Sequence, residues 1–209
     1  TGSGRYGVAL ARDFPALSVT ATDIVPESLV ASRKLAEEVG VSSIRFEIAD
    51  AQKLQYKNDS FDIVFSDAVI QHIPDEVRAV HEMARVTRSG GVVIIAVVNR
   101  RSIHRVVRII KKILGFKNEY QSEKFYSRKD LRRLVERAGL AVIAESGFYP
   151  AYGVYRLKKH ARFFGPLGRI LNRITTGIDT LTGGLVSSRV GFEIVVVGRK
   201  EAGGLPGAI

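Results

Sequence analysis

The chain opens with a glycine-rich stretch, Thr1-Gly2-Ser3-Gly4-Arg5-Tyr6-Gly7, which is typical of a turn in an α/β fold. The apolar run at residues 8–11 directly behind it predicts the helix that the turn begins. Glycines at this spacing let the backbone of a turn approach a ligand closely, and in α/β proteins such a turn follows a buried strand. Met83 is the only methionine. We therefore expect that the first strand lies upstream of Thr1, so that the domain is truncated at its N-terminus.

Strand-like and helical stretches alternate behind the turn. Helical spacing predicts helices over 26–39, 75–87 and 127–138, with Gly90-Gly91 ending the second and Gly139 the third. Apolar and β-branched runs predict strands at residues 17–22, 43–48, 61–65, 92–98, 140–145 and 191–197. Strands separated by helices predict an α/β, Rossmann-like fold with a doubly wound, mostly parallel sheet and helices on both faces.

Length and composition exclude several classes of protein. At 209 residues and 23.0 kDa the chain predicts one domain over 1–209, with helical insertions at 100–126 and 149–188 before the last strand. The absence of Cys excludes disulfide scaffolds and thiol nucleophiles, and four scattered His residues predict no metal site. No apolar run reaches the roughly 18 residues of a membrane span, and we expect a cytoplasmic protein.

Charge is unevenly distributed along the chain. Residues 1–99 carry 10 Lys and Arg against 13 Asp and Glu, whereas residues 100–209 carry 22 against 8. Within the second half, residues 101–115 and 160–174 have apolar residues at helical spacing with basic residues between them, as in amphipathic basic helices. They predict docking on an anionic membrane surface, or simply a solvated basic face. Nucleic acid is a less favoured partner, because no RNA-binding module accompanies the charge.

Further motifs follow the glycine turn. Gly2-x-Gly4-x-x-Gly7 matches a dinucleotide-binding pattern, and Asp23, 19 residues after Gly4, stands where an acidic residue accepts hydrogen bonds from ribose hydroxyls. This signal alone fits nicotinamide, flavin and adenosyl cofactors. Asp50-Ala51 follows the next predicted strand, and then come Phe61-Asp62-Ile63-Val64 and, after a helix, the stretch 85–91 that ends in Gly90-Gly91.

In this order and at these separations, the motifs resemble those of the class I S-adenosylmethionine-dependent methyltransferases of the small-molecule type. The resemblance covers residues 1–99 well and the helix–strand unit at 127–148 moderately. It implies S-adenosylmethionine as cofactor and methyl transfer to a small-molecule or lipid-like acceptor. It places Gly2 and Gly4 beside the methionine part of the cofactor, Asp23 on the ribose, Ile24 against the adenine, Asp50 and Ala51 at the adenine amino group and ring, and Ser66 with the segment to residue 71 along the methyl-transfer side.

Two side chains are candidates for removing a proton from an oxygen or nitrogen acceptor. His72 stands just after the fourth strand of the resembled fold, at the expected mouth of the site, and Asp67 is the second candidate. His81 has a structural role in the predicted helix, and His104 and His160, in basic segments, are expected to face solvent or an anion.

Alternative functions are compatible with parts of this pattern. A nicotinamide-dependent oxidoreductase would explain the glycine pattern but leaves Asp50-Ala51 and residues 85–91 unexplained. A catalytically silent protein that binds an adenosyl cofactor or a membrane surface would explain the basic segments. An RNA methyltransferase is the third alternative.

Overall fold

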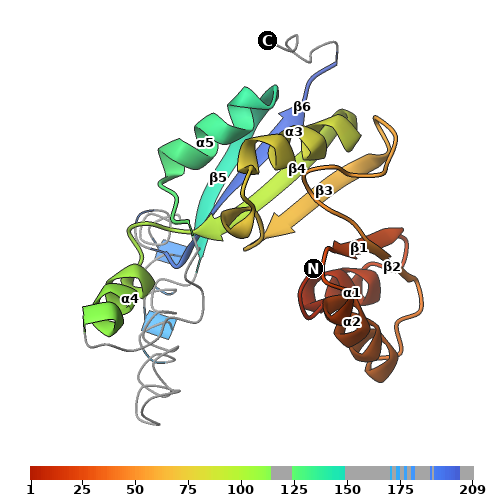
Figure 1. Cartoon of the computed structure of the whole chain (residues 1–209), viewed down its shortest axis with the longest axis horizontal. Coiled ribbons are helices and arrows are strands. Elements are labelled where there is room, and N and C mark those ends of the chain that lie inside the picture. Colours follow the sequence, from red (N-terminus) through yellow and green to blue (C-terminus); the bar gives the residue numbers. More distant parts are fainter. Residues whose placement is uncertain are drawn as a thin grey trace. The chain divides into compact units, whose positions relative to one another are not determined.

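The computed structural model describes residues 1–113, 124–148 and 191–202, with isolated positions between 170 and 189. The chain divides into two compact units, Thr1–Asn58 and Asp59–Ile209. In Figure 1 the first unit is red to orange and the second runs from yellow-orange to blue. No helix among the described residues is long and apolar enough to cross a bilayer.

The first unit is a two-stranded parallel sheet covered by two helices. It contains α1 (Arg5–Asp13), β1 (Val19–Asp23), α2 (Pro26–Glu38) and β2 (Ile44–Ile48), which confirms the helices and strands predicted here. Pro26 suits the first turn of α2, where its missing N–H has no helical partner to lose. Both helices pack on the sheet around a small apolar core of Val8, Ala11, Ala21, Ala36 and Ile44.

The second unit is built on a four-stranded sheet. Its elements are β3 (Phe61–Asp67), a 3-10 turn η1 (Ile70–His72), α3 (Glu76–Val86), β4 (Thr87–Val98), α4 (Ile103–Ile113), α5 (Arg128–Arg137), β5 (Leu140–Phe148) and β6 (Glu193–Lys200). The strand order is β3-β4-β6-β5, with β3 and β4 parallel. β6 runs antiparallel to both β4 and β5, so this sheet is mixed.

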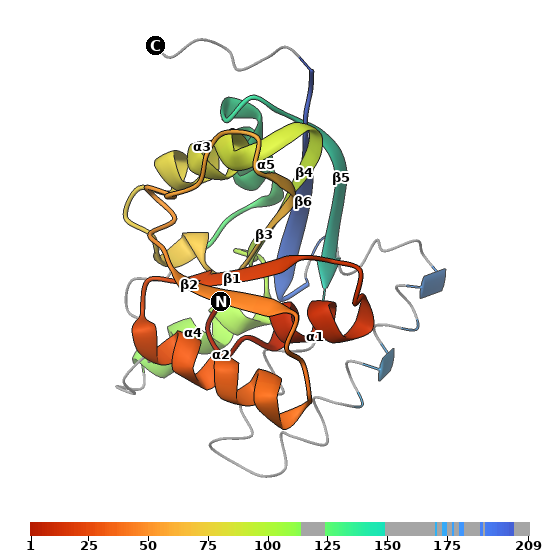
Figure 2. The same cartoon turned by 90° about the vertical axis from the view of Figure 1, so that its right-hand side faces the viewer.

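Helices α3 and α5 pack side by side on one face of this sheet (Figures 1 and 2). The α5 helix begins at Ser127 with a capping box: the Asp130 amide donates to Ser127 Oγ at 3.2 Å, and the Ser127 amide donates to Asp130 Oδ2 at 3.0 Å. This confirms the predicted serine cap. The core between the helices and the sheet is formed by Ala79, Val80, Met83 and Ala84 of α3, Leu131, Leu134 and Val135 of α5, and Val93, Ile95, Val97, Ile194 and Val196 of the strands.

The predicted role of Gly90-Gly91 as a helix end is wrong. Helix α3 already ends at Val86, and β4 begins at Thr87 and runs through both glycines. The strand is irregular there, because Phe61 pairs with Thr87 whereas Ile63 pairs with Val92. Gly90 has a left-handed φ of 77°, and a Cβ on Gly91 would lie 2.7 Å from the Asp62 carbonyl oxygen. The glycines therefore allow a bulge inside a strand.

A buried ammonium joins the end of β6 to the start of β4. The side chain of Lys200 is 8% exposed. Its Nζ donates to Asp59 Oδ1 at 2.9 Å, to the Thr87 carbonyl at 2.7 Å and to the Arg85 carbonyl at 3.3 Å. All three donors of the ammonium thus have partners.

Of the two predicted basic helices, the first is present as α4. Nearly all of residues 160–174 and of the predicted insertion at 149–188 lie outside the described residues, as do residues 114–123 of the insertion predicted at 100–126.

Candidate functional site

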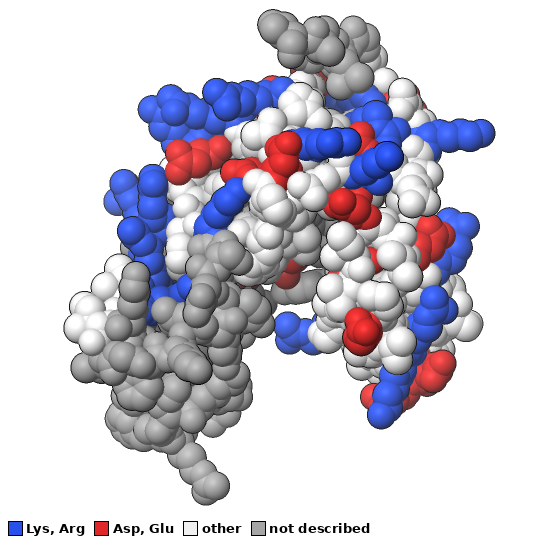
Figure 3. All heavy atoms as spheres, viewed as in Figure 1, with Lys and Arg blue, Asp and Glu red and all other residues white. Residues whose placement is uncertain are grey.

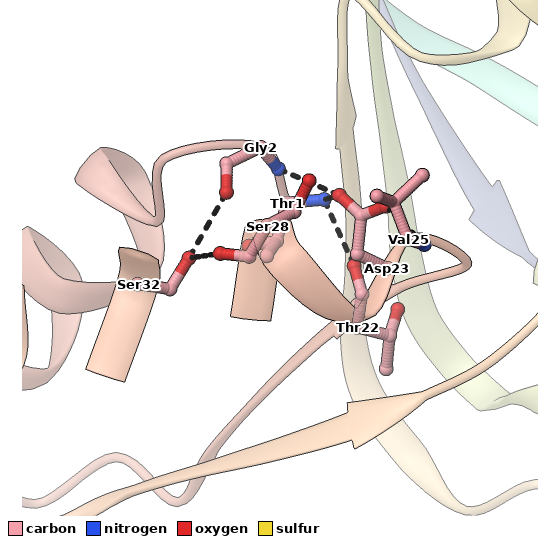
Figure 4. Close-up of polar contacts among 7 residues, drawn as sticks. All are labelled: Thr1, Gly2, Thr22, Asp23, Val25, Ser28 and Ser32. Atoms are coloured by element: carbon pink, nitrogen blue, oxygen red, sulfur yellow. Dashed lines mark hydrogen bonds and ion pairs between the residues drawn. The ribbon is translucent and has the colours of Figure 1, made fainter. Parts of the chain in front are cut away.

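The glycine turn and the end of β1 meet at the Asp23 carboxylate (Figure 4). Asp23 Oδ2 accepts hydrogen bonds from the backbone nitrogen of Thr1 at 2.9 Å and from the Gly2 amide at 2.8 Å. Oδ1 accepts from the Val25 amide at 2.9 Å. The turn before α1 and the loop after β1 are therefore organised around one carboxylate.

The environment keeps this carboxylate charged. Burial raises the pKa of Asp23, but hydrogen bonds from the backbone nitrogens of Thr1, Val25 and Gly2 outweigh burial and lower the pKa below its ordinary value of 3.8. Because the pKa of Asp23 is lowered in the folded state, the charged carboxylate stabilises the fold at neutral pH. This stabilisation is lost as the pH falls through the folded-state pKa.

Gly2 and Gly4 are each suited to their positions in the turn for a different structural reason. Gly2 adopts a left-handed φ of 54° with open space around it. At Gly4, with φ of 74°, a Cβ would lie 2.6 Å from the Ser32 side chain, so only glycine lets the turn pack against α2. The Ser32 hydroxyl lies 3.0 Å from the Gly2 carbonyl oxygen and 2.8 Å from that of Ser28, which fixes the turn on the helix (Figure 4).

Other residues predicted to bind the cofactor lie at the same edge of this unit. Because β1 and β2 are parallel, their carboxyl ends meet, and the Ala49 amide donates to the Asp23 carbonyl at 3.1 Å. Asp50 and Ala51 follow directly, and Asp50 Oδ1 accepts from the Gln52 amide at 2.8 Å. Ile24 is exposed next to Asp23. The structure thus brings Gly2, Asp23, Ile24 and Asp50 to one edge.

In the second unit, the predicted residues lie after β3. Ser66 is buried at the end of the strand, and its Oγ has no hydrogen-bond partner among the described residues. Asp67 is half-buried, Ala68 has a left-handed φ of 53°, and His72 is exposed at the end of η1. A strained non-glycine residue at the carboxyl end of a parallel strand is a common feature of functional sites.

Three further polar residues lie at this end: Gln71, the last residue of the segment predicted to line the methyl-transfer side, and Asn99 and Tyr126, which were not singled out from the sequence. The Gln71 side chain is buried, and its Oε1 accepts from the Val98 amide at 3.0 Å. Asn99 is buried directly after β4, and Tyr126 pairs with it through an isolated bridge. Asn99 directly follows the predicted strand 92–98, and this position was the signal from which it could have been found. Tyr126 is brought here by a contact between distant parts of the chain, which local patterns do not show.

Tyr126 is buried at this end of the sheet, and its hydroxyl has no hydrogen-bond partner among the described residues. Burial raises the pKa of this hydroxyl above its ordinary value of 10, and the negative charge of Glu76 raises it further. The phenol therefore stays protonated and can donate a hydrogen bond.

The expectation that His104 faces solvent or an anion is wrong. Its side chain is buried, and its ring lies edge-on to Phe192 with 5.1 Å between the ring centroids. The basic neighbours in the sequence gave no sign of this contact, because Phe192 lies far along the chain.

These residues fit an adenosyl cofactor in their chemistry. A charged carboxylate at the end of β1 is an acceptor for ribose hydroxyls, and the turn beside Gly2 leaves open space. In the second unit, the Ser66 hydroxyl has no hydrogen-bond partner among the described residues, and it is a buried polar group of the kind that a ligand satisfies.

Comparison with known proteins gives the family of the N-terminal part. Residues 1–95 match the methyltransferase domain family. Over 95 residues the chain is 39% identical to the ubiquinone/menaquinone biosynthesis C-methyltransferase UbiE of Bdellovibrio bacteriovorus, covering 46% of this chain and 40% of that protein. It is 31% identical to the phosphatidylethanolamine N-methyltransferase of Cereibacter sphaeroides, covering 49% of this chain and 51% of that protein. The chain thus spans about half the length of the curated relatives it matches.

Solved structures share the fold over nearly the whole chain. A S-adenosylmethionine-dependent methyltransferase from Thermotoga maritima, described as a possible histamine N-methyltransferase, has a TM-score of 0.63 at 19% identity and covers 96% of this chain and 78% of its own. Phosphoethanolamine N-methyltransferase 2 of Haemonchus contortus, in complex with S-adenosyl-L-methionine, has a TM-score of 0.63 at 16% identity, covering 96% of this chain and 47% of its own. These neighbours confirm the predicted Rossmann-like α/β fold.

Proposed function

We propose that this chain, whose residues 1–95 match the methyltransferase domain family, transfers the methyl group of S-adenosylmethionine to a small-molecule or lipid-like acceptor. The observation that supports the proposal most is the Asp23 carboxylate, held charged at the end of β1 beside the glycine turn. A nicotinamide-dependent oxidoreductase is no longer an alternative, since the family match covers the motifs that this activity left unexplained.

The first unit would hold the cofactor. Asp23 would accept the ribose hydroxyls, with Gly2 and Gly4 beside the methionine part. Ile24 offers an exposed apolar side chain to the adenine. Asp50 and Ala51 would face the adenine amino group and ring, and in the second unit Ser66 would donate its unpartnered hydroxyl.

Binding of the cofactor is tested by calorimetric titration of the protein with S-adenosylmethionine, S-adenosylhomocysteine and NADH. We expect micromolar affinity for the adenosyl pair, in which the adenosine is joined to the methionine or homocysteine part that the glycine turn addresses. We expect no binding of NADH, which has an adenosine but carries a pyrophosphate in place of that part. If the full natural protein bound none of the three compounds, the proposed enzymatic function would be excluded, and the catalytically silent protein would remain as the alternative.

Methyl transfer needs an aligned acceptor more than it needs a protein nucleophile. When bound, S-adenosylmethionine supplies a methyl group already activated by the sulfonium. The protein then contributes proximity and orientation, which are worth up to about 7–11 kcal/mol in the best cases. His72, exposed after β3, would take the proton of an oxygen or nitrogen acceptor, and Asp67 is the second candidate.

The role of His72 predicts a specific loss of activity. With an acceptor found by screening lipid extracts for S-adenosylhomocysteine release, His72→Gln should lower the rate of methyl transfer about 100-fold, because glutamine cannot take the proton of the acceptor. The affinity for S-adenosylmethionine should stay unchanged. An unaltered rate in His72→Gln, with the rate lost in Asp67→Asn, would assign the proton to Asp67.

A lipid-like acceptor is supported by the names of two relatives, which act in quinone biosynthesis and on phosphatidylethanolamine. Such acceptors reside in membranes, so we propose a cytoplasmic protein that works at an anionic membrane surface through the basic segment 101–115. Residues 160–174, proposed for the same role, lie almost entirely outside the described residues.

A further inference from the structure

Helix α4 leaves the sheet at the end that carries the candidate acceptor residues. It follows β4 after a short link in which the Arg101 amide donates to Asn99 Oδ1 at 2.9 Å and the Ser102 amide donates to the Asn99 carbonyl at 3.1 Å. Since β3 and β4 are parallel, this link lies at the same end as Ser66 and Asp67. The start of α4 is thus fixed relative to that end.

One face of α4 is attached to the second unit. His104 is buried there, with its ring edge-on to Phe192. The Arg108 guanidinium lies over the Phe125 ring, 5.2 Å from its centroid. These two contacts, one helical turn apart, determine which way the rest of the helix faces.

The opposite face of α4 is apolar and exposed. Val106, Ile109 and Ile113 are 55%, 48% and 77% exposed. Their spacing of three and four residues places them in one stripe. At about 100° per residue, this stripe lies on the far side of the helix from His104. We call these three residues the outer stripe. Three large apolar side chains in a row on an exposed helix face indicate a surface that is covered in use.

The charge around the outer stripe indicates what covers it. Residues 100–113 contain four Arg and two Lys and no acidic residue. Arg101, two residues before α4, and Arg105, in its first turn, are both exposed, and helical spacing places Arg105 to one side of the outer stripe. In Figure 3, basic side chains gather beside uncharged atoms at the position of α4. An apolar stripe bordered by cations matches an anionic lipid surface, where acyl chains lie beneath negative headgroups. A nucleic acid would use the cations but leave the apolar residues unexplained.

We propose that α4 docks this protein on anionic lipid bilayers, with the outer stripe in the acyl boundary and Arg101 and Arg105 at the headgroups. Because α4 follows the end of β4 after a short link, docking would hold the carboxyl ends of β3 and β4 close to the membrane, where a lipid-like acceptor is found. The inference that a membrane acceptor is methylated rests on the proposed methyl transfer. The docking of α4 on lipid does not depend on methyl transfer, and it is measured without cofactor or acceptor.

The absence of Trp makes a site-specific test possible. Ile109→Trp places a single fluorophore in the outer stripe, and Val30→Trp places one on the exposed face of α2 as a matched control. With vesicles of phosphatidylcholine and phosphatidylglycerol in equal parts, we expect a blue shift and quenching by brominated acyl chains for Ile109→Trp only. Vesicles of phosphatidylcholine alone should give a much weaker signal.

The second measurement is the binding to vesicles of a variant that carries a negative charge in the outer stripe. Ile109→Glu should lower the fraction that cosediments with the anionic vesicles at least about tenfold, whereas Val30→Glu should bind like the wild type. An unchanged far-UV circular dichroism spectrum and Tm of Ile109→Glu would show that the fold is intact. Equal binding by wild type and Ile109→Glu would overturn the proposal. So would binding to poly(U) in the absence of any vesicle binding, which would assign the cations to nucleic acid.

Discussion

Replacement of Asp23 by alanine is expected to weaken the binding of S-adenosylmethionine by about 100-fold. A carboxylate that accepts two ribose hydroxyls makes two charge-assisted hydrogen bonds, each worth about 1.5–3 kcal/mol, and loss of both exceeds the 2.8 kcal/mol of a 100-fold change. Asp23→Asn keeps one acceptor oxygen but loses the charge, so it should fall between wild type and alanine. Calorimetric titration measures all three.

The control for this prediction is Asp13→Ala, which removes an exposed carboxylate in the same unit whose partner is the exposed Arg12. It should leave the affinity unchanged. Because Asp23 also accepts the Gly2 and Val25 amides, the far-UV circular dichroism and the Tm of each variant are recorded first. A folded Asp23→Ala protein that binds within threefold of wild type would exclude Asp23 from the cofactor site.

Lys200→Met is expected to lower the free energy of unfolding by about 3 kcal/mol. Methionine fills a similar volume but donates nothing, so the Thr87 carbonyl loses its 2.7 Å hydrogen bond and Asp59 loses its cation. The buried end of β6 is then left beside polar groups without donors. Urea denaturation followed by circular dichroism gives the value.

Two variants separate this interaction from a general effect of removing lysine. Lys129→Met, at an exposed position on α5, should change the free energy of unfolding by less than about 0.5 kcal/mol. Asp59→Asn should give an intermediate loss, because asparagine tolerates the left-handed φ of 59° at this position and keeps a neutral acceptor. If Lys200→Met were as stable as Lys129→Met, the ammonium would have no net effect.

Most elements could be predicted because their signals are local. The serine before α5, the proline opening α2 and the apolar run of β4 each specify structure within a few neighbouring residues. Asp23, the last residue of β1, could likewise be predicted from its separation in sequence from the glycine turn. Its hydrogen bonds to the Gly2 and Val25 amides fit that prediction.

The remaining features depend on contacts between distant residues. Gly90 and Gly91 resemble a helix end in sequence, and only pairing with β3 shows that they form a bulge within β4. The burial of His104 requires Phe192, and the position of Tyr126 requires the end of β4. The direction of β6 is also not encoded in its own apolar pattern, because parallel and antiparallel strands bury the same side chains.

The place of β6 in the sheet has a consequence for synthesis of the protein. This strand lies between β4 and β5 although it follows both in the chain. While the ribosome has not yet released Glu193–Lys200, the apolar segment Val92–Val98 presents an open hydrogen-bonding edge. Pairing that waits for such a distant segment is slow, and open apolar edges of this kind are what chaperones shield. The nascent chain therefore passes through a stage at which the apolar edge of β4 is open to aggregation.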